Sequence, residues 1–190
     1  MRLRQRRWLT TALLLCLSVA FAREPEPQAP LPAAAGTAEV WFPPWDDAQG
    51  PLLAALYGAR TQVLVQAFLL THRKIADSLI AAHRRGVDVR VLADARQHAE
   101  NHGSLLRVLA RAGVPVWLET RYKNAHNKVM VIDAGSPQAA VVTGSFNFTW
   151  SAQNMNAENL LIIRGNAALA DRFASNWMRH RAEAEPLESR

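Results

Sequence analysis

Cysteine is almost missing from this 190-residue chain, and the single one, Cys16, lies close to the N-terminus. The chain after it can therefore form no disulfide, no thiol nucleophile and no thiolate metal site. A long apolar run is missing too, because WLTTALLLCLSVAFA (residues 8–22) is shorter than the roughly 20 residues that span a bilayer comfortably. We therefore expect a folded part that is held together by its hydrophobic core alone.

The first 22 residues have the pattern of a secretory signal. Four arginines precede the short apolar run, and Ala20-Phe21-Ala22 fits the small-x-small rule for cleavage. The segment REPEPQAPLPAAAG (residues 23–36) is rich in proline and alanine, which is typical of a linker. We predict a cleaved signal peptide over 1–22, a linker over 23–36 and a secreted or periplasmic protein; an uncleaved membrane anchor is the alternative.

Positive charge is scarce once this leader is set aside. The formal charge of the full chain is +6, but after the four leader arginines are removed 18 Lys and Arg face 16 Asp and Glu, which leaves +2. A strongly basic surface that coats nucleic acid therefore does not follow from net charge, and any such patch has to be local.

The remaining chain alternates between strand and helix patterns. Val-, Ile- and Leu-rich runs bounded by Gly or Asp indicate strands, and apolar residues recurring every three or four positions indicate helices. The predicted strands cover 38–42, 61–70, 87–94, 114–119, 126–133, 138–144 and 158–165, and the predicted helices 51–59, 74–86, 104–113 and 166–184. We expect an α/β domain over 37–184 with a mixed, largely parallel sheet and helices on both faces, followed by a tail over 185–190.

Polar residues interrupt one of these apolar strands, in AHNKVMVID at residues 125–133. Side chains two apart in a strand share a face, so His126 and Lys128 should point the same way. Asp133 has the opposite parity and points elsewhere unless the strand bends, so its role, in the site or structural, stays open. A histidine beside a lysine can supply a nucleophile or a proton next to a cation.

The next strand ends in TGSFNFT at residues 143–149. Gly144 allows the backbone to come close to a ligand, and Ser145 and Asn147 offer uncharged hydrogen-bonding groups. Glu158 begins the strand that follows and could accept a hydrogen bond from the His126 ring, fixing its tautomer. Taken together these residues suit a phosphate oxyanion, with no evident metal ligands.

The joint pattern H-x-K-x4-D followed by G-S-x-N resembles the signature of the phospholipase D superfamily, and in particular its short bacterial endonucleases with a single motif. The resemblance covers roughly residues 38–180 and places His126, Lys128, Asp133, Asn147 and Glu158 among the catalytic residues, with Gly144 and Ser145 in substrate binding. Ten residues separate Asp133 from Gly144, where about six are usual, which we interpret as a longer hairpin turn. Trp150 stands where a small or basic residue is usual, and we predict that it contacts the substrate.

That resemblance implies a two-step reaction that needs two histidines, and the chain contains one motif. His72 in HRK is no second copy, because Asp77 follows Lys74 too soon and no G-S-x-N comes after it. We therefore predict a homodimer whose twofold axis brings two copies of His126 to one phosphate.

The expected activity is that of a metal-independent, cofactor-free phosphodiesterase. The first candidate is a non-specific endonuclease that acts on DNA or RNA. Hydrolysis of a phospholipid headgroup is the alternative, and non-catalytic nucleic-acid binding is a third.

Two further histidines, His98 and His102, have the i, i+4 spacing of a zinc pair on a helix. A third ligand is not evident and Gly103 ends the segment, so we expect a polar loop near the mouth of the site instead.

Overall fold

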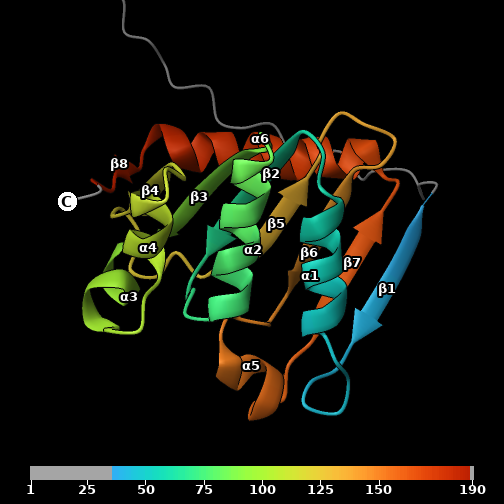
Figure 1. Ribbon diagram of the computed structural model, residues 1–190, viewed down its shortest axis with the longest axis horizontal. Helices are drawn as coiled ribbons and strands as arrows, with labels where there is room; N and C mark the ends of the chain where they lie inside the picture. Colours follow the sequence, from blue (N-terminus) through green and yellow to red (C-terminus); the bar gives the residue numbers. More distant parts are fainter. Residues whose placement is uncertain (1–35, 189–190) are drawn as a thin grey trace, which may run out of the picture. The chain divides into compact units, whose positions relative to one another are not determined.

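A computed structural model describes residues 36–188, so the predicted signal peptide and nearly all of the predicted linker lie outside the described residues. The described part is built on one eight-stranded sheet with the strand order β1-β7-β6-β5-β2-β3-β4-β8 (Figure 1). Its strands are β1 (Thr37–Trp41), β2 (Gln62–Ala67), β3 (Asp88–Asp94), β4 (Val116–Glu119), β5 (Lys128–Ile132), β6 (Ala140–Gly144), β7 (Leu160–Arg164) and β8 (Glu185–Pro186).

The mixed α/β architecture is confirmed, but the parallel part of the sheet is smaller than the sequence suggested. Only the β2–β3 and β3–β4 pairings are parallel, and the other five are antiparallel. Parallel neighbours need a long crossover, and among strands that are neighbours in the described sheet only β2, β3 and β4 are joined in succession by helical crossovers. A short turn joins β5 to β6, which forces an antiparallel pair.

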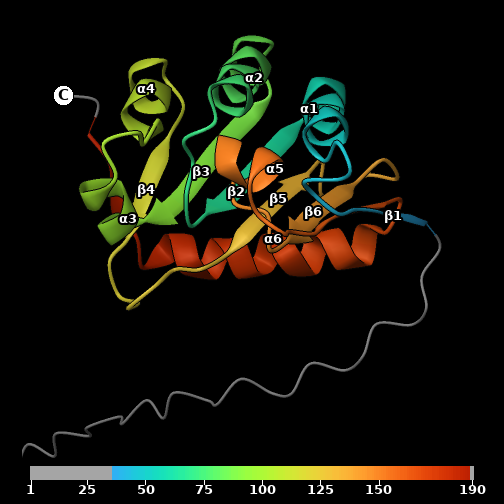
Figure 2. The ribbon, with the colours of Figure 1, turned by 90° about the horizontal axis from the view of Figure 1, so that it is seen from below.

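Six helices accompany the sheet in the described residues: α1 (Gln49–Gly58), α2 (Arg73–Arg84), α3 (Ala95–Glu100), α4 (Leu106–Arg111), α5 (Trp150–Asn154) and α6 (Ala167–Ala182). Figure 2 shows α1, α2 and α4 over one face of the sheet and α6 across the other. No helix among residues 36–188 has the length and apolar character needed to cross a bilayer.

Alternation along each strand divides the core between these two faces. Val63, Val65, Met130 and Ile132 pack toward α1 and α2, whereas Leu64 and Val131 pack toward α6 and its fully buried Trp177. Each buried side chain of this size stabilises the fold by roughly 1.5–3 kcal/mol. The indole Nε1 of Trp177 donates to the carbonyl oxygen of Val65 at 2.8 Å, which satisfies its buried polar group.

Three short elements were not predicted. Helix α3 is capped by Asp94, whose side chain accepts from the backbone N–H of Gln97, and α5 is capped by Thr149 in the same way through Ala152. Strand β8 lies in the predicted tail and pairs with β4, so the folded domain continues past residue 184. In α3, α5 and β8 the apolar residues are too few to form a pattern that could be recognised from sequence.

The direction of the strands defines one edge of the sheet, here named the site edge. Parallel strands β2, β3 and β4 run toward it, and β6 runs with them because each of the two antiparallel pairings, β2–β5 and β5–β6, reverses the direction. Strands β5 and β7 start there. The residues just before β5, just after β6 and just before β7 therefore converge at this edge, where α3 and α5 also lie (Figure 1).

Candidate active site

The site edge brings together most of the polar residues that the sequence singled out. His126 and Lys128 lie at the start of β5, Gly144 and Ser145 at the end of β6, and Glu158 just before β7. The G-S-x-N loop is fastened to the end of β2, because Phe148 forms a bridge with Leu70 and its carbonyl oxygen accepts from the N–H groups of Thr71 and His72. Neighbouring strand ends thus form one polar cluster.

His126 lies just outside β5, and Lys128 is its first residue. The ammonium of Lys128 donates to the carbonyl oxygen of His126 at 2.8 Å. The aromatic ring of Phe68 contacts both side chains, with its centroid 4.4 Å from that of the His126 ring and 4.8 Å from Nζ of Lys128. The two side chains therefore share one side of the strand, as the parity argument predicted, and Phe68 holds them there.

Phe68 and Asp94 are the residues of this cluster that sequence reasoning missed. Phe68 follows β2 as one more apolar residue of a buried run, so nothing in the pattern distinguished it. Asp94 is buried, and besides capping α3 its second carboxylate oxygen accepts from the backbone N–H of Ala125 at 2.7 Å. That bond fixes the backbone one residue before His126. The Asp that ends the predicted strand 87–94 is the signal that could have indicated it.

Lys128 is buried, with 6% of its surface exposed. Burial lowers the pKa of its ammonium from 10.5 to about 8, although the nearby carboxylate of Glu158 acts to raise that pKa. A positive charge held in such surroundings is poorly compensated by the protein itself. An incoming phosphate would supply the missing negative charge.

Removing the charge of Lys128 should lower the activity but should not lower the stability of the protein. We expect kcat/KM to fall as the pH rises through about 8, because the ammonium that binds the phosphoryl oxygens is lost there. Lys128→Met should lower kcat/KM by roughly a hundredfold or more and abolish that alkaline limb. Since the folded-state pKa lies below the usual value, the charge opposes folding below pH 8, so the same variant should melt at an equal or higher temperature. A lower melting temperature would contradict the assignment.

Gly144 allows a close contact within the protein, and the close approach to a ligand stays a prediction. Its φ is +145°, and a Cβ at this position would lie 2.3 Å from the carbonyl oxygen of Asn159. A side chain would therefore separate β6 from β7 at the point where the Ser145 loop leaves the sheet. The glycine shapes the site by allowing this approach between strands.

Ser145 and Glu158 are bonded to each other. The Ser145 hydroxyl donates to Glu158 and accepts from the backbone N–H of Asn159 at 3.0 Å, and the other carboxylate oxygen of Glu158 accepts from the side-chain amide of Asn156 at 3.0 Å. The sequence predicted that Glu158 orients the His126 ring. Both of its oxygens instead hold Ser145 and Asn156, and its charge acts on Lys128.

Asn147 carries a buried side-chain oxygen that has no hydrogen-bond partner within residues 36–188. The residues on either side of it, Phe146 and Phe148, are buried almost completely and anchor the loop. A buried amide oxygen without a partner is destabilising by about 1–3 kcal/mol. The alternation of aromatic and polar residues in SFNF thus places Phe inward and leaves Ser145 and Asn147 on the other side.

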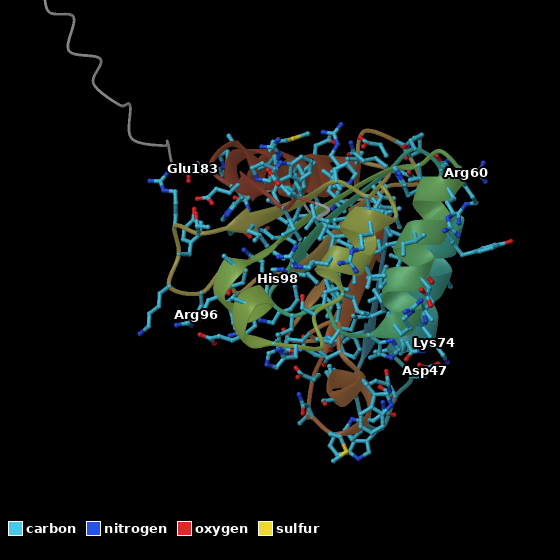
Figure 3. All side chains as sticks on the ribbon, turned by 60° about the vertical axis from the view of Figure 1, so that its left-hand side comes forward. Asp47, Arg60, Lys74, Arg96, His98 and Glu183 are labelled. Atoms are coloured by element: carbon cyan, nitrogen blue, oxygen red, sulfur yellow. The ribbon has the colours of Figure 1, made fainter. Side chains whose placement is uncertain are left out.

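Asp133 is not brought to this cluster. It follows β5 at the opposite edge of the sheet, beside Arg60, which Figure 3 shows far from the end of the molecule where Asp47 and Lys74 lie. Its carboxylate accepts from the backbone N–H groups of Arg60, Thr61 and Gln62 and from the Thr61 hydroxyl, at 2.7–3.1 Å. The sequence left the role of Asp133 open between catalytic and structural, and these hydrogen bonds favour the structural one.

Electrostatics support this structural role of Asp133. Burial acts to raise the pKa of its carboxyl, but the backbone hydrogen bonds from Gln62, Thr61 and Arg60, with that from the Thr61 hydroxyl, outweigh burial and hold the pKa below its usual value. The residue also has φ of +51°, a conformation that Asp tolerates better than most side chains.

The remaining candidates divide by position. Trp150 begins α5 at the site edge with 58% of its surface exposed, where it can reach a substrate. His98 lies in α3, its Nδ1 hydrogen-bonded to the Ser104 hydroxyl at 2.8 Å, so the predicted loop is a short helix. Within residues 36–188 no three His, Cys, Asp or Glu side chains lie close enough to hold a metal ion.

The chain is similar in sequence to proteins of a known family. Residues 52–180 match the family described as "Cardiolipin synthase, PLD-like domain". The chain is 39% identical over 124 residues to a phospholipase D of Rickettsia bellii, and 35% identical over 121 residues to the mitochondrial cardiolipin hydrolase of Xenopus laevis. These matches cover 65% and 64% of this chain but only 59% and 55% of the relatives.

Solved structures give the same result for the fold. Nuc of Salmonella typhimurium, a phospholipase D family member, superposes with a TM-score of 0.76 at 29% identity, covering 82% of this chain and all of Nuc. NucT of Helicobacter pylori gives a TM-score of 0.73 at 22% identity, over 80% of this chain and all of NucT. The chain therefore belongs to the phospholipase D superfamily, a family of phosphodiesterases.

Proposed function

We propose that this protein is a metal-independent phosphodiesterase that acts as a secreted homodimer, with nucleic acid as the first candidate substrate. The observation that carries the proposal is the exposed His126 ring beside the buried Lys128 ammonium, at an edge that also carries the Ser145 hydroxyl and the Asn147 amide. A nucleophile, a cation and amide and hydroxyl groups are together what phosphoryl transfer without a metal requires.

In the proposed reaction two imidazoles work on one phosphorus atom. His126 of one subunit forms a P–N bond while the P–O bond to the leaving group breaks, and His126 of the partner subunit gives its proton to the departing oxygen. In the second step the partner's His126 takes a proton from water, the water oxygen forms a P–O bond and the P–N bond breaks. Lys128 from both subunits stabilises the charge on the phosphoryl oxygens.

The dimer is proposed because each chain supplies a single histidine of this kind. His72 lies at the N-cap of α2 and is 7% exposed, and its buried Nδ1 has no partner in the described part of the chain, so it does not face a ligand as His126 does. An isologous interface at the site edge would bring the second imidazole to the first. The two should titrate as a unit and give a bell-shaped pH dependence.

A phospholipid headgroup phosphodiester is the second candidate substrate. It is favoured by large apolar side chains that are exposed at the site edge, including Trp150, and by relatives named phospholipase D and cardiolipin hydrolase. The same two-histidine chemistry would serve, because only the groups esterified to phosphorus differ.

Cleavage assays in EDTA test this proposal. Purified protein is incubated separately with plasmid DNA, RNA and phosphatidylcholine vesicles, and we expect cleavage of at least one substrate at a rate that EDTA changes less than about twofold. Acid-labile, base-stable phosphate attached to the chain during turnover would identify the phosphohistidine. Loss of all cleavage in EDTA, restored by a divalent ion, would overturn the proposal.

A further inference from the structure

Four large apolar side chains are exposed on two neighbouring segments of the site edge. Phe42 and Trp45 lie in the loop between β1 and α1, and Trp150 and Met155 lie in and just after α5, with 49%, 86%, 58% and 69% of their surfaces exposed. We name these four residues the apolar rim. Single exposed apolar residues are ordinary, but four large ones on adjoining segments suggest an interaction surface.

The two segments are tied together, so the apolar rim is one surface. The side-chain oxygen of Gln153 in α5 accepts from the backbone N–H groups of Ala48 and Gln49, and its amide donates to the carbonyl oxygen of Asp46, all at 2.9–3.1 Å. The backbone N–H of Glu158 also donates to the carbonyl oxygen of Pro43. Figures 1 and 2 show α5 and this loop side by side at the end of the sheet.

Charge around the apolar rim argues against a nucleic-acid partner. The segments 36–49 and 143–159 contain no Lys or Arg, and they carry the acidic residues Glu39, Asp46, Asp47 and Glu158. A phosphate backbone needs cations for its affinity, whereas Trp, Phe and Met enter the interfacial region of a bilayer without them.

Shape favours a deformable partner over a second copy of the chain. Helix α5 projects beyond the ends of the strands (Figure 1), so the apolar rim is a protrusion and not a flat face. A projecting tip can enter a fluid lipid surface, but a twofold contact needs a patch that complements itself.

We propose that the apolar rim docks the protein peripherally on a phospholipid bilayer, with Trp45 and Trp150 in the interfacial region. Docking would place the site edge, and with it His126, next to the lipid headgroups. This inference extends the second candidate substrate of the proposed function, a phospholipid. It rests on that proposed function for its link to catalysis, whereas docking itself can be measured without turnover.

The test is co-sedimentation of the full chain with phosphatidylcholine vesicles, carried out on His126→Asn so that no lipid is consumed. Adding Trp45→Ser and Trp150→Ser should weaken the partition coefficient at least about tenfold, because two interfacial indoles are removed. Raising the salt to about 0.5 M should change binding less than twofold, since charge contributes little. Tyr57→Ser with Met178→Ser is the matched control, because these residues are also exposed but lie outside the rim, and it should bind like the parent.

Unchanged vesicle binding in the Trp45/Trp150 double variant would overturn the docking proposal. So would a change in its oligomeric state without lipid, which would mean that the rim joins two copies, or a selective loss of DNA binding. With His126 restored, Trp45→Ser alone should still cleave the soluble ester bis(p-nitrophenyl) phosphate at the parent rate, because Trp45 lies outside the catalytic cluster. Failure of that cleavage in the parent protein itself would count against the proposed function and leave docking untouched.

Discussion

His126→Asn is expected to lower phosphodiester cleavage by at least about 10⁴-fold while the protein stays folded. The side chain is exposed, and the only contact found for its ring within residues 36–188 is with Phe68, so little stability depends on it. The hydrogen bond to Lys128 uses the backbone oxygen and survives the substitution. The measurement is the cleavage rate together with thermal melting by circular dichroism, and His102→Asn, at another exposed histidine, should behave like the parent.

Mixed dimers sharpen this prediction. If each catalytic centre needs both copies of His126, refolding equal amounts of parent and His126→Asn chains leaves about one quarter of the dimers active, by random pairing. Activity per total dimer should then fall to about one quarter of the parent value. A value of one half would mean that each chain works alone, and the two-histidine mechanism would be wrong.

Asp133→Asn is expected to lower the melting temperature by about 5–10 °C and to leave the cleavage rate within a few-fold of the parent value. The carboxylate accepts from three backbone N–H groups and a hydroxyl. An amide presents an NH₂ group to some of these donors, at a loss of about 2–4 kcal/mol. The measurements are thermal melts and initial cleavage rates at about 25 °C.

Acid titration gives this prediction a second readout. Because the folded-state pKa of Asp133 lies below the unfolded value, its stabilising effect is present above about pH 4 and is lost as the pH falls through the folded-state pKa. The variant should therefore lose less stability on acidification than the parent. Asp171→Asn, at an exposed carboxylate on α6, is the control and should melt within about 1 °C of the parent. If Asp133→Asn kept full stability but lost activity, Asp133 would have a catalytic role and not a structural one.

The sequence by itself determined most of the elements and the chemistry that they carry. The predicted strands and long helices fall within a few residues of the observed ones, because apolar periodicity reports which face of an element is buried. The pairing of His126 with Lys128 also followed from the two-residue period of a strand, which is a local property. The family followed from the joint spacing of these residues and Gly144, Ser145 and Asn147.

Only the tertiary structure decided which of these residues meet. Asp133 is only five residues beyond Lys128 in the sequence, but because the strand between them is extended it lies at the opposite edge of the sheet. There its carboxylate accepts hydrogen bonds from the backbone N–H groups of Arg60, Thr61 and Gln62. Phe68 and Glu158 reach Lys128 from β2 and β7 through strand order, which periodicity does not encode. The burial that lowers the pKa of Lys128, and the joining of two distant segments into the apolar rim, arise from packing between strands and loops far apart in the chain.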